Sequence, residues 1–397
     1  MFETLSPNAP DAILALIGKF KADPNPRKID LGVGVYKAED GSVPIMRAVK
    51  QAEARLLTDE MTKTYVGTVG NAEFRRSMLD LILGPDHTLL QNERIASAQT
   101  AGGSGALRLG AEMIKMVNPD AVIWAPTPTW ANHIPLIGST GLPLQNYPYY
   151  DPETLTVNFE GMCEFLKTQT KAGDVVLLHG CCHNPTGADL SDKQWESLAK
   201  LMADKNLLPF IDLAYFGLGR NMDDDTYGLR TVLDHNEEVV IAASCSKNFA
   251  LYRERVGLVA ISTKTPDLAN TLQGHLGGIQ RKIISMPPNH GAEIVATILQ
   301  DEALRADWQG ELTAMRERIN GLRNQLSDAL NVQGAEKAAR AIRDQWGMFS
   351  QLPLSEAQAI ALRRDHSVYI TNSGRTNIAG LNADNLPRFA KAVLSVL

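Results

Sequence analysis

Short apolar runs alternate with amphipathic patterns through the middle of the chain, and this alternation predicts the fold. Five runs are apolar almost throughout and rich in β-branched residues, as expected of strands that are covered on both faces. These runs are residues 121–125, 174–178, 207–212, 238–244 and 256–262. Between the second and the third, Ser191 and Gln194 have capping-box spacing, and an apolar helical stripe follows them. Strand, helix and strand in succession predict a wound α/β domain with a mainly parallel sheet.

A different pattern begins after residue 295. Apolar residues recur every three or four positions from Leu304 to Leu326, which predicts one long amphipathic helix rather than another strand–helix–strand unit. We expect this helix to lead into a smaller α+β domain, which ends in a helix after Asp384. The predicted division is discontinuous: a large domain at 44–313, and a small domain made of 1–43 and 314–397.

Composition and charge narrow the class of protein. The chain has 397 residues, of which 44% are hydrophobic and 21% charged, as in a globular protein of two domains. A net charge of −6 argues against a general nucleic-acid binder. No apolar run approaches the roughly 18 residues that a membrane span needs. The first residues lack the basic start of a secretory signal, so we expect a cytoplasmic protein.

The four cysteines lack the paired CxxC spacing of a structural zinc site. Cys181 and Cys182 are adjacent, and a disulfide between them would be strained. We therefore expect buried free thiols and no metal site.

Two polar loops are candidates for a ligand site. The stretch "TAGGSGALR" (100–108) places Gly103 and Ser104 before a helical pattern, where free backbone amides suit a phosphate. A plain tight turn explains this loop equally well, because it matches neither the dinucleotide-binding motif nor the P-loop. The stretch "HGCCHNPTG" (179–187) follows a predicted strand, where α/β sheets bind ligands. There, Asn184 before Pro185 either directs its amide inward or only forms a structural turn.

A carboxylate interrupts the third apolar run. Asp212 lies in "PFIDLAYFG" (209–217), and a buried carboxylate needs a cationic partner. That partner is either a protonated ring nitrogen of a ligand or a salt bridge within the core. Tyr215 lies three residues further on and could reach the same ligand.

The stretch "SCSKNFALYRERVG" (244–257) contains a lysine directly after a strand end. Shielded from water and near other cations, the amine of Lys247 would have a lowered pKa and act as a nucleophile. Ser244, Ser246 and Arg255 are candidate phosphate ligands. Alone, Lys247 would more often be an ordinary solvated lysine, but Asp212 and the two loops together favour the covalent interpretation.

In this order, the motifs closely resemble the class I aminotransferases that use pyridoxal 5′-phosphate, specifically the aspartate/aromatic amino acid aminotransferase family. The resemblance runs from "DLGVGVYK" (30–37) through the stretches above to "SGRTNIAGLN" (373–382), which is nearly the whole chain. It implies the fold of PLP-dependent transferases (fold type I) and a homodimer with shared active sites. It also implies ping-pong transfer of an amino group from aspartate or an aromatic amino acid to 2-oxoglutarate.

The resemblance assigns a role to each candidate at the cofactor. Lys247 would hold the cofactor as a Schiff base and then carry the proton between Cα and the cofactor's C4′. Asp212 would keep the pyridine nitrogen protonated, and Tyr215 and Asn184 would bond the phenolic oxygen. The other implied contacts are Trp130 stacked on the ring, His133 behind Asp212, and Gly103, Ser104, Ser244, Ser246, Arg255 and a neighbouring subunit's Tyr65 at the phosphate.

For the substrate, the resemblance implies two arginines. Arg375 would bind the α-carboxylate through its bidentate fork, and Arg281, donated across a dimer interface, would bind the distal carboxylate. Gly34, Asn184 and Trp130 lie at positions where the family contacts the substrate.

Several positions bear on the preferred substrate. Val35 and Lys37 resemble aspartate-preferring members, whereas Ser104, Val43 and Met286 resemble aromatic-preferring ones. Apolar side chains lower the cost of burying a phenyl ring, so we hypothesise dual specificity. The rival hypotheses are another PLP-dependent reaction, such as β-decarboxylation or β-elimination, and a non-catalytic binding module built on the same fold.

Overall fold

The structure is a computed structural model that describes residues 2–7, 11–332 and 334–397. Its contacts divide the chain into two compact units. The larger unit comprises Pro44–Arg318 and Gln345–Gly347, and the smaller comprises Met1–Val43, Ile319–Asp344 and Met348–Leu397. The division between residues 318 and 319 falls inside α12 (Glu302–Asn331), the long helix that the apolar spacing predicts.

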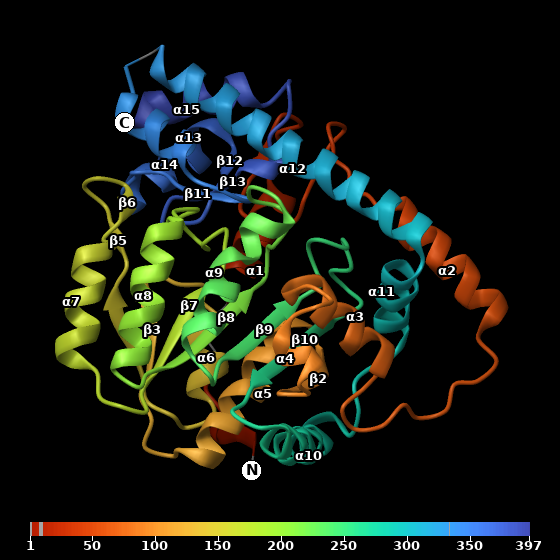
Figure 1. The fold of residues 1–397 in the computed structure, drawn as a ribbon. Coiled ribbons are helices and arrows are strands. Elements are labelled where there is room, and N and C mark those ends of the chain that lie inside the picture. The colour runs from red at the N-terminus through yellow and green to blue at the C-terminus, as the bar shows by residue number, and fades with distance from the viewer. Residues whose placement is uncertain (1, 8–10, 333) are drawn as a thin grey trace. The chain divides into compact units, whose positions relative to one another are not determined.

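A seven-stranded sheet forms the centre of the larger unit (Figure 1). In spatial order its strands are β2 (Ile95–Ala101), β10 (Val256–Ser262), β9 (Val240–Ser244), β8 (Leu208–Leu213), β7 (Val175–His179), β3 (Ile123–Thr127) and β4 (Leu144–Pro148). The strands from β9 to β4 pair in parallel, whereas β10 is antiparallel to both of its neighbours. Each of the five predicted runs forms a strand of this sheet. The prediction of a mainly parallel α/β fold is therefore confirmed.

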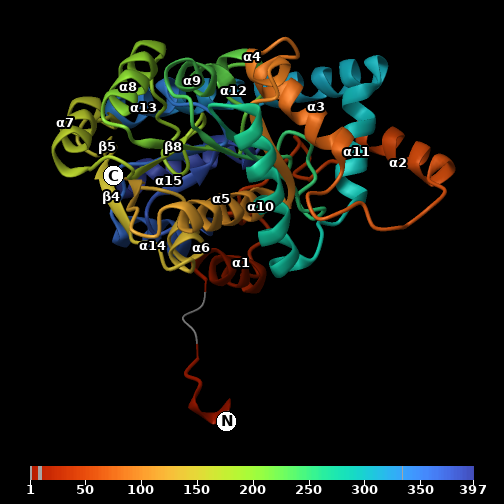
Figure 2. The same ribbon diagram turned by 60° about the horizontal axis from the view of Figure 1, so that its bottom comes forward.

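Helices cover both faces of this sheet. Figure 2 shows α8 and α9 on one side of β8 and α5 on the other. The helices that lie wholly in this unit are α2 (Arg47–Asp59), α3 (Ala72–Leu83), α4 (Thr88–Gln91), α5 (Gly102–Val117), α6 (His133–Gly138), α7 (Phe159–Gln169), α8 (Asp192–Asp204), α9 (Met222–His235), α10 (Pro266–Ile284) and α11 (His290–Gln300). A short hairpin, β5 (Tyr150–Asp151) and β6 (Thr156–Val157), adds a separate pair of strands.

Two helices show why these sequences fold as they do. Helix α8 begins with the predicted capping box, in which Ser191 and Gln194 bond each other's backbone, and its apolar stripe is buried. Helix α5 lies so close to the sheet that a Cβ on Gly110 would be 2.8 Å from the Phe210 ring and 3.0 Å from Val240. Glycine is therefore required for this close packing of α5 on the sheet.

The smaller unit is α+β. Its elements are the 3-10 helices Phe2–Thr4 and Ile378–Gly380, the strands β1 (Ile29–Asp30), β11 (Phe349–Gln351), β12 (Val368–Tyr369) and β13 (Arg375–Asn377), and the helices α1 (Ala12–Ala22), α13 (Glu336–Asp344), α14 (Glu356–His366) and α15 (Leu386–Val396). Strand β1 pairs in parallel with β12, and β11 pairs antiparallel with β13. The first of these pairs joins the beginning and the end of the chain within one unit.

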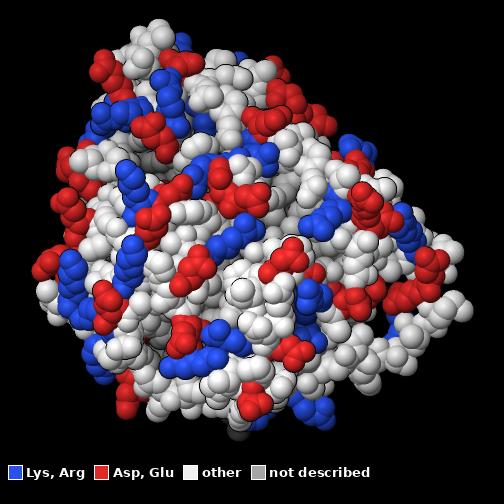
Figure 3. All heavy atoms as spheres, in the orientation of Figure 1, with Lys and Arg blue, Asp and Glu red and all other residues white. Residues whose placement is uncertain are grey.

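The charged side chains of the described residues are interspersed on the face shown in Figure 3, with basic groups beside acidic ones. This distribution agrees with a net charge of only −6. Among residues 2–7, 11–332 and 334–397, none of the helices has both the length and the apolar character for crossing a bilayer.

Candidate active site

Polar residues gather at the carboxyl ends of β7 and β8, where parallel sheets bind ligands. Asp212, near the end of β8, pairs in register with His179 at the end of β7. The buried Asp212 carboxylate lies 3.1 Å from Nε2 of His133. Burial raises the pKa of Asp212, but the hydrogen bond and charge of His133, with a further contribution from the charge of Lys247, outweigh it and lower the pKa. Asp212 is therefore an ionised carboxylate inside the protein, able to pair with a cation.

A hydrogen-bonded chain of histidines supports this carboxylate from behind. The Thr129 hydroxyl lies 2.8 Å from Nδ1 of His133 and 3.1 Å from Nε2 of His179. Burial lowers the pKa of His179 well below its ordinary value, so this ring is neutral. Sequence analysis predicted His133 but missed Thr129 and His179. The sequence contained a clue to His179, because this histidine is the first residue of the polar loop that contains Asn184.

Tyr215, Asn184 and Lys247 meet beside Asp212. The Asn184 side-chain amide donates to the Tyr215 hydroxyl at 3.4 Å. The Lys247 amine lies 4.6 Å from the centroid of the Tyr215 ring. Asn184 also begins a turn. Its side-chain amide is directed inward to Tyr215, so this residue both forms the turn and contributes to the cluster. The motif residues from three separate loops thus form one cluster.

A second part of the cluster surrounds the N-terminus of α5, which no described side chain caps. A Cβ on Gly102 would lie 2.5 Å from Nη2 of Arg255, and one on Gly103 would lie 3.0 Å from Cβ of Ser244. Nη1 of Arg255 lies 3.5 Å from the Ser246 hydroxyl. Backbone amides, hydroxyls and a guanidinium therefore converge on one point, which is the chemistry of a phosphate site. Ser104 lies in the first turn of the same helix.

These residues fit pyridoxal 5′-phosphate. The helix N-terminus with Arg255 suits its phosphate, Asp212 suits a protonated ring nitrogen, and Tyr215 with Asn184 suits its phenolic oxygen. Lys247 supplies an amine for covalent attachment. Trp130 packs edge-on against the His133 ring at a centroid distance of 5.3 Å, beside Asp212.

Two predicted residues of the larger unit lie apart from this cluster. The Tyr65 side chain is 89% exposed, and Arg281 is exposed in the last turn of α10. Within the described part of this single chain, neither forms a hydrogen bond or ring contact with the cluster.

The smaller unit brings Gly34 and Arg375 together on one aromatic ring. The Arg375 guanidinium carbon lies 4.4 Å from the centroid of Phe349, and Nη2 donates to the Gly32 carbonyl at 2.8 Å. A Cβ on Gly34 would lie 2.8 Å from Cζ of Phe349, so glycine leaves this ring room beside the arginine. The orientation of Arg375 is thus set by stacking and by a backbone acceptor.

Comparison with known proteins agrees with this geometry. The family model described as aminotransferase class I and II matches residues 26–393. The chain is 45% identical over 396 residues to the aromatic-amino-acid aminotransferase of Paracoccus denitrificans, covering 100% of both chains. It is 42% identical over 400 residues to the aspartate aminotransferase of Escherichia coli strain K12, again covering 100% of both.

Solved structures show the same similarity. An aromatic-amino-acid aminotransferase from Burkholderia pseudomallei, covalently bound to pyridoxal phosphate, superposes with a TM-score of 0.97 at 40% identity. The match covers 100% of this chain and 99% of that one. The covalently bound cofactor of that relative is consistent with the cluster described above, in which the amine of Lys247 follows the candidate phosphate ligand Ser246.

Proposed function

The chain belongs to the class I and II aminotransferases, and from this premise we propose that it transfers the amino groups of both aspartate and aromatic amino acids to 2-oxoglutarate. The enzyme is a pyridoxal-phosphate-dependent transaminase. The observation that carries the proposal is the cluster of Lys247, the ionised Asp212 and the Tyr215–Asn184 pair at the strand ends. Relatives named for aromatic amino acids and for aspartate, at 45% and 42% identity, support both donor classes.

Each residue of the cluster has its own role in the proposed transamination. Pyridoxal phosphate, when bound, supplies an electron sink for the charge that develops at the substrate's Cα. Nζ of Lys247 would hold the cofactor covalently and, when free, would accept the proton from the substrate's Cα and return it to the carbon that receives it in the product. The carboxylate of Asp212 stabilises a proton on the ring nitrogen, because it stays ionised at neutral pH. Tyr215 and Asn184 orient the phenolic oxygen.

Further cofactor contacts complete the proposal. Trp130 covers the ring face, and His133 keeps the Asp212 carboxylate oriented through its 3.1 Å contact. The phosphate contacts are Gly103, Ser104, Ser244, Ser246 and Arg255.

Substrate binding rests on charge and on apolar area. We assign the α-carboxylate to Arg375, whose planar fork binds a carboxylate bidentately, with Gly34 leaving room beside it. Arg281 binds the distal carboxylate of aspartate, glutamate or 2-oxoglutarate. Apolar Met286 and Val43 favour an aromatic side chain. One binding site thus accepts either a carboxylate or a ring.

We further propose a homodimer in which Tyr65 and Arg281 serve the partner's active site. Their exposure on the single chain supports this, as does the exposure of Leu57 and Met61 on the same segment as Tyr65, at 89% and 90%. We propose the cytoplasm as the location, where four free thiols remain reduced.

A panel of amino donors tests the function. Purified enzyme is supplied with 2-oxoglutarate and either aspartate, phenylalanine, tyrosine or tryptophan, and glutamate is measured, with Lys247→Ala as the control. We expect turnover with aspartate and with an aromatic donor, and none in the variant. Glutamate from aspartate alone would refute dual specificity. Alanine formed from aspartate without 2-oxoglutarate would instead identify β-decarboxylation, the rival reaction.

A further inference from the structure

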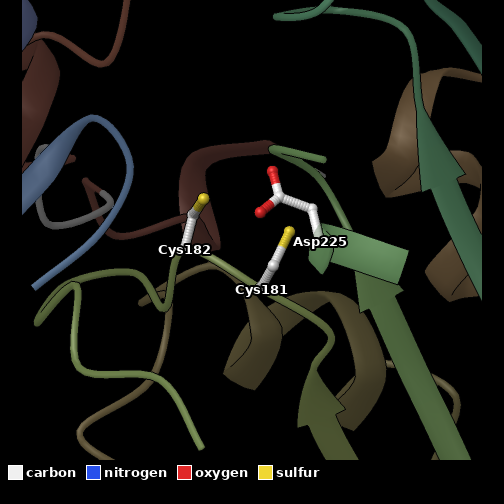
Figure 4. Close-up of side chains that lie close together, drawn as sticks. All are labelled: Cys181, Cys182 and Asp225. Atoms are coloured by element: carbon white, nitrogen blue, oxygen red, sulfur yellow. The ribbon is translucent and has the colours of Figure 1, made fainter. Parts of the chain in front are cut away.

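Three buried metal-ligating side chains meet next to the candidate active site (Figure 4). Cys181 and Cys182 follow β7, and Asp225 lies in the first turn of α9. One ligand atom of each, two thiol sulfurs and a carboxylate oxygen, lies within 4.8 Å of the others. Asp225 is more than forty positions from the two adjacent cysteines in sequence, and only the fold brings its carboxylate to them.

The Asp225 carboxylate is held in one orientation. Oδ2 accepts the backbone N–H groups of Gly217 at 2.8 Å and Gly219 at 2.9 Å, and Oδ1 accepts that of Arg220 at 2.9 Å. A carboxylate has about four lone-pair positions, so these three bonds leave capacity for a cation. Bonds of this kind orient the ligand of a metal.

Glycines keep the space around Cys182 open. A Cβ on Gly219 would lie 2.6 Å from Oδ1 of Asp225 and 2.9 Å from Sγ of Cys182, between the two ligand atoms. A Cβ on Gly347 would lie 2.7 Å from the same sulfur. Any larger residue at position 219 would therefore push the thiol and the carboxylate apart.

We propose that Cys181, Cys182 and Asp225 bind one thiophilic divalent cation of the Zn²⁺ or Cd²⁺ class. A zinc–sulfur bond of about 2.3 Å places two ligands of one tetrahedral ion roughly 3.5–4 Å apart, so atoms within 4.8 Å need only small rotations. Two metal–sulfur bonds form as two thiol protons leave, so the net charge of this buried region does not change. Two sulfur ligands select against Mg²⁺ and Ca²⁺.

This site adjoins residues that the proposed function uses. Sγ of Cys182 lies 3.9 Å from the Tyr215 carbonyl oxygen, and Cys182 is two residues before Asn184. A bound cation pulls the thiols and Asp225 together, which shifts the backbone that positions the Tyr215–Asn184 pair. We therefore expect the cation to inhibit transamination. Binding itself does not depend on the proposed function, and only the inhibition does. This proposal departs from the expectation from sequence that the chain carries no metal site.

Cadmium titration of the reduced holoenzyme tests the proposal. The ultraviolet thiolate-to-cadmium charge-transfer band and calorimetry are expected to give one Cd²⁺ per chain. The double variant Cys181→Ser/Cys182→Ser is expected to lose binding, and Asp225→Asn to weaken it by roughly tenfold or more. Cys163→Ser, which removes the half-buried thiol of α7, is the matched control and should bind as the wild type does. Binding that survives in the double variant would overturn the site.

A measurement on the wild type keeps the test valid if a variant does not fold. X-ray absorption of the zinc-loaded enzyme is expected to show two sulfur ligands together with oxygen. A shell without sulfur would overturn the proposal. Loss of glutamate formation on Cd²⁺ addition, absent in the double variant, would support the link to Tyr215 and Asn184. Binding without inhibition would overturn that link alone.

Discussion

Replacing His183 with phenylalanine is expected to make the folded chain less sensitive to acid. The His183 side chain is 1% exposed, and its ring stacks on Tyr149 at a centroid distance of 4.3 Å. Its Nδ1 lies 2.8 Å from the Thr186 hydroxyl. Burial, and after it the charge of His133, lowers the pKa of His183 to about 3. The imidazole is therefore neutral in the folded chain down to strongly acidic pH.

The sign and size of the effect follow from proton binding. A histidine in the unfolded chain has a pKa of about 6.5. Between that pH and about 3, the unfolded chain binds a proton that the folded chain does not, so stability falls as the pH falls. Each pH unit corresponds to about 1.4 kcal/mol, which gives a loss of roughly 2–3 kcal/mol between pH 6.5 and 4.5. The loss is complete only below the folded pKa.

Phenylalanine keeps the ring stacked on Tyr149 but binds no proton. It removes the contact with Thr186, a hydrogen bond that is worth about 1 kcal/mol. We expect His183→Phe to be about 1 kcal/mol less stable than the wild type at pH 7.5 and roughly 1–2 kcal/mol more stable at pH 4.5. The order of stability should therefore reverse between the two pH values.

Urea unfolding followed by circular dichroism, at both pH values and with the cofactor bound, measures this reversal. His235→Gln is the matched control, because His235 is an exposed histidine in the last turn of α9. The control removes a histidine that no neighbouring element buries, so the reversal of the order of stability should not appear in it. If the His183→Phe and wild-type values stay equally far apart at pH 7.5 and 4.5, the argument from the buried neutral ring is wrong.

Three further variants test the cofactor site. Lys247→Ala is expected to abolish covalent attachment of the cofactor and turnover, and an unchanged visible absorption spectrum would contradict the assignment. Asp212→Asn replaces a charge with a neutral amide; the loss of about 3 kcal/mol from a charged hydrogen bond predicts a fall in kcat of roughly a hundredfold, measured with saturating cofactor. A fall of less than about twofold would show that this carboxylate is not the partner of the ring. Gly102→Ala places a Cβ 2.5 Å from Nη2 of Arg255 at a φ of +72°, so cofactor retention after dialysis should decrease, whereas Gly310→Ala, which has open space, should not change it.

The sheet was predictable where strands are apolar on both faces, and not elsewhere. The five predicted strands are central or nearly so, and every residue of β7, β9 and β10 is buried. Strand β2 was missed because its buried positions include Ser97 and Gln99. The Gln99 amide donates to the Pro288 carbonyl at 2.7 Å, and such a partner removes the cost of burying a polar side chain. Hydrophobic patterning does not detect a polar residue whose partner is distant in sequence.

The candidate site was predictable to the extent that each residue carries a local signal. Asp212 could be recognised because a carboxylate inside an apolar strand needs a partner. The cluster of Cys181, Cys182 and Asp225 could not, since each residue is ordinary in its own stretch and only the loop between β8 and α9 brings the carboxylate to the thiols.

Tyr65 and Arg281 could not be recognised from local sequence for a different physical reason. The arguments that identify Asp212 and Lys247 all depend on burial, because desolvation is what makes a charge costly or an amine reactive. Tyr65 is 89% exposed on this chain, and Arg281 lies exposed at the end of α10, so desolvation imposes nothing on either. In the proposed dimer, a second chain would cover them and create their environment. Burial therefore identifies the functional residues that one chain encloses. It would identify Tyr65 and Arg281 only in the proposed dimer.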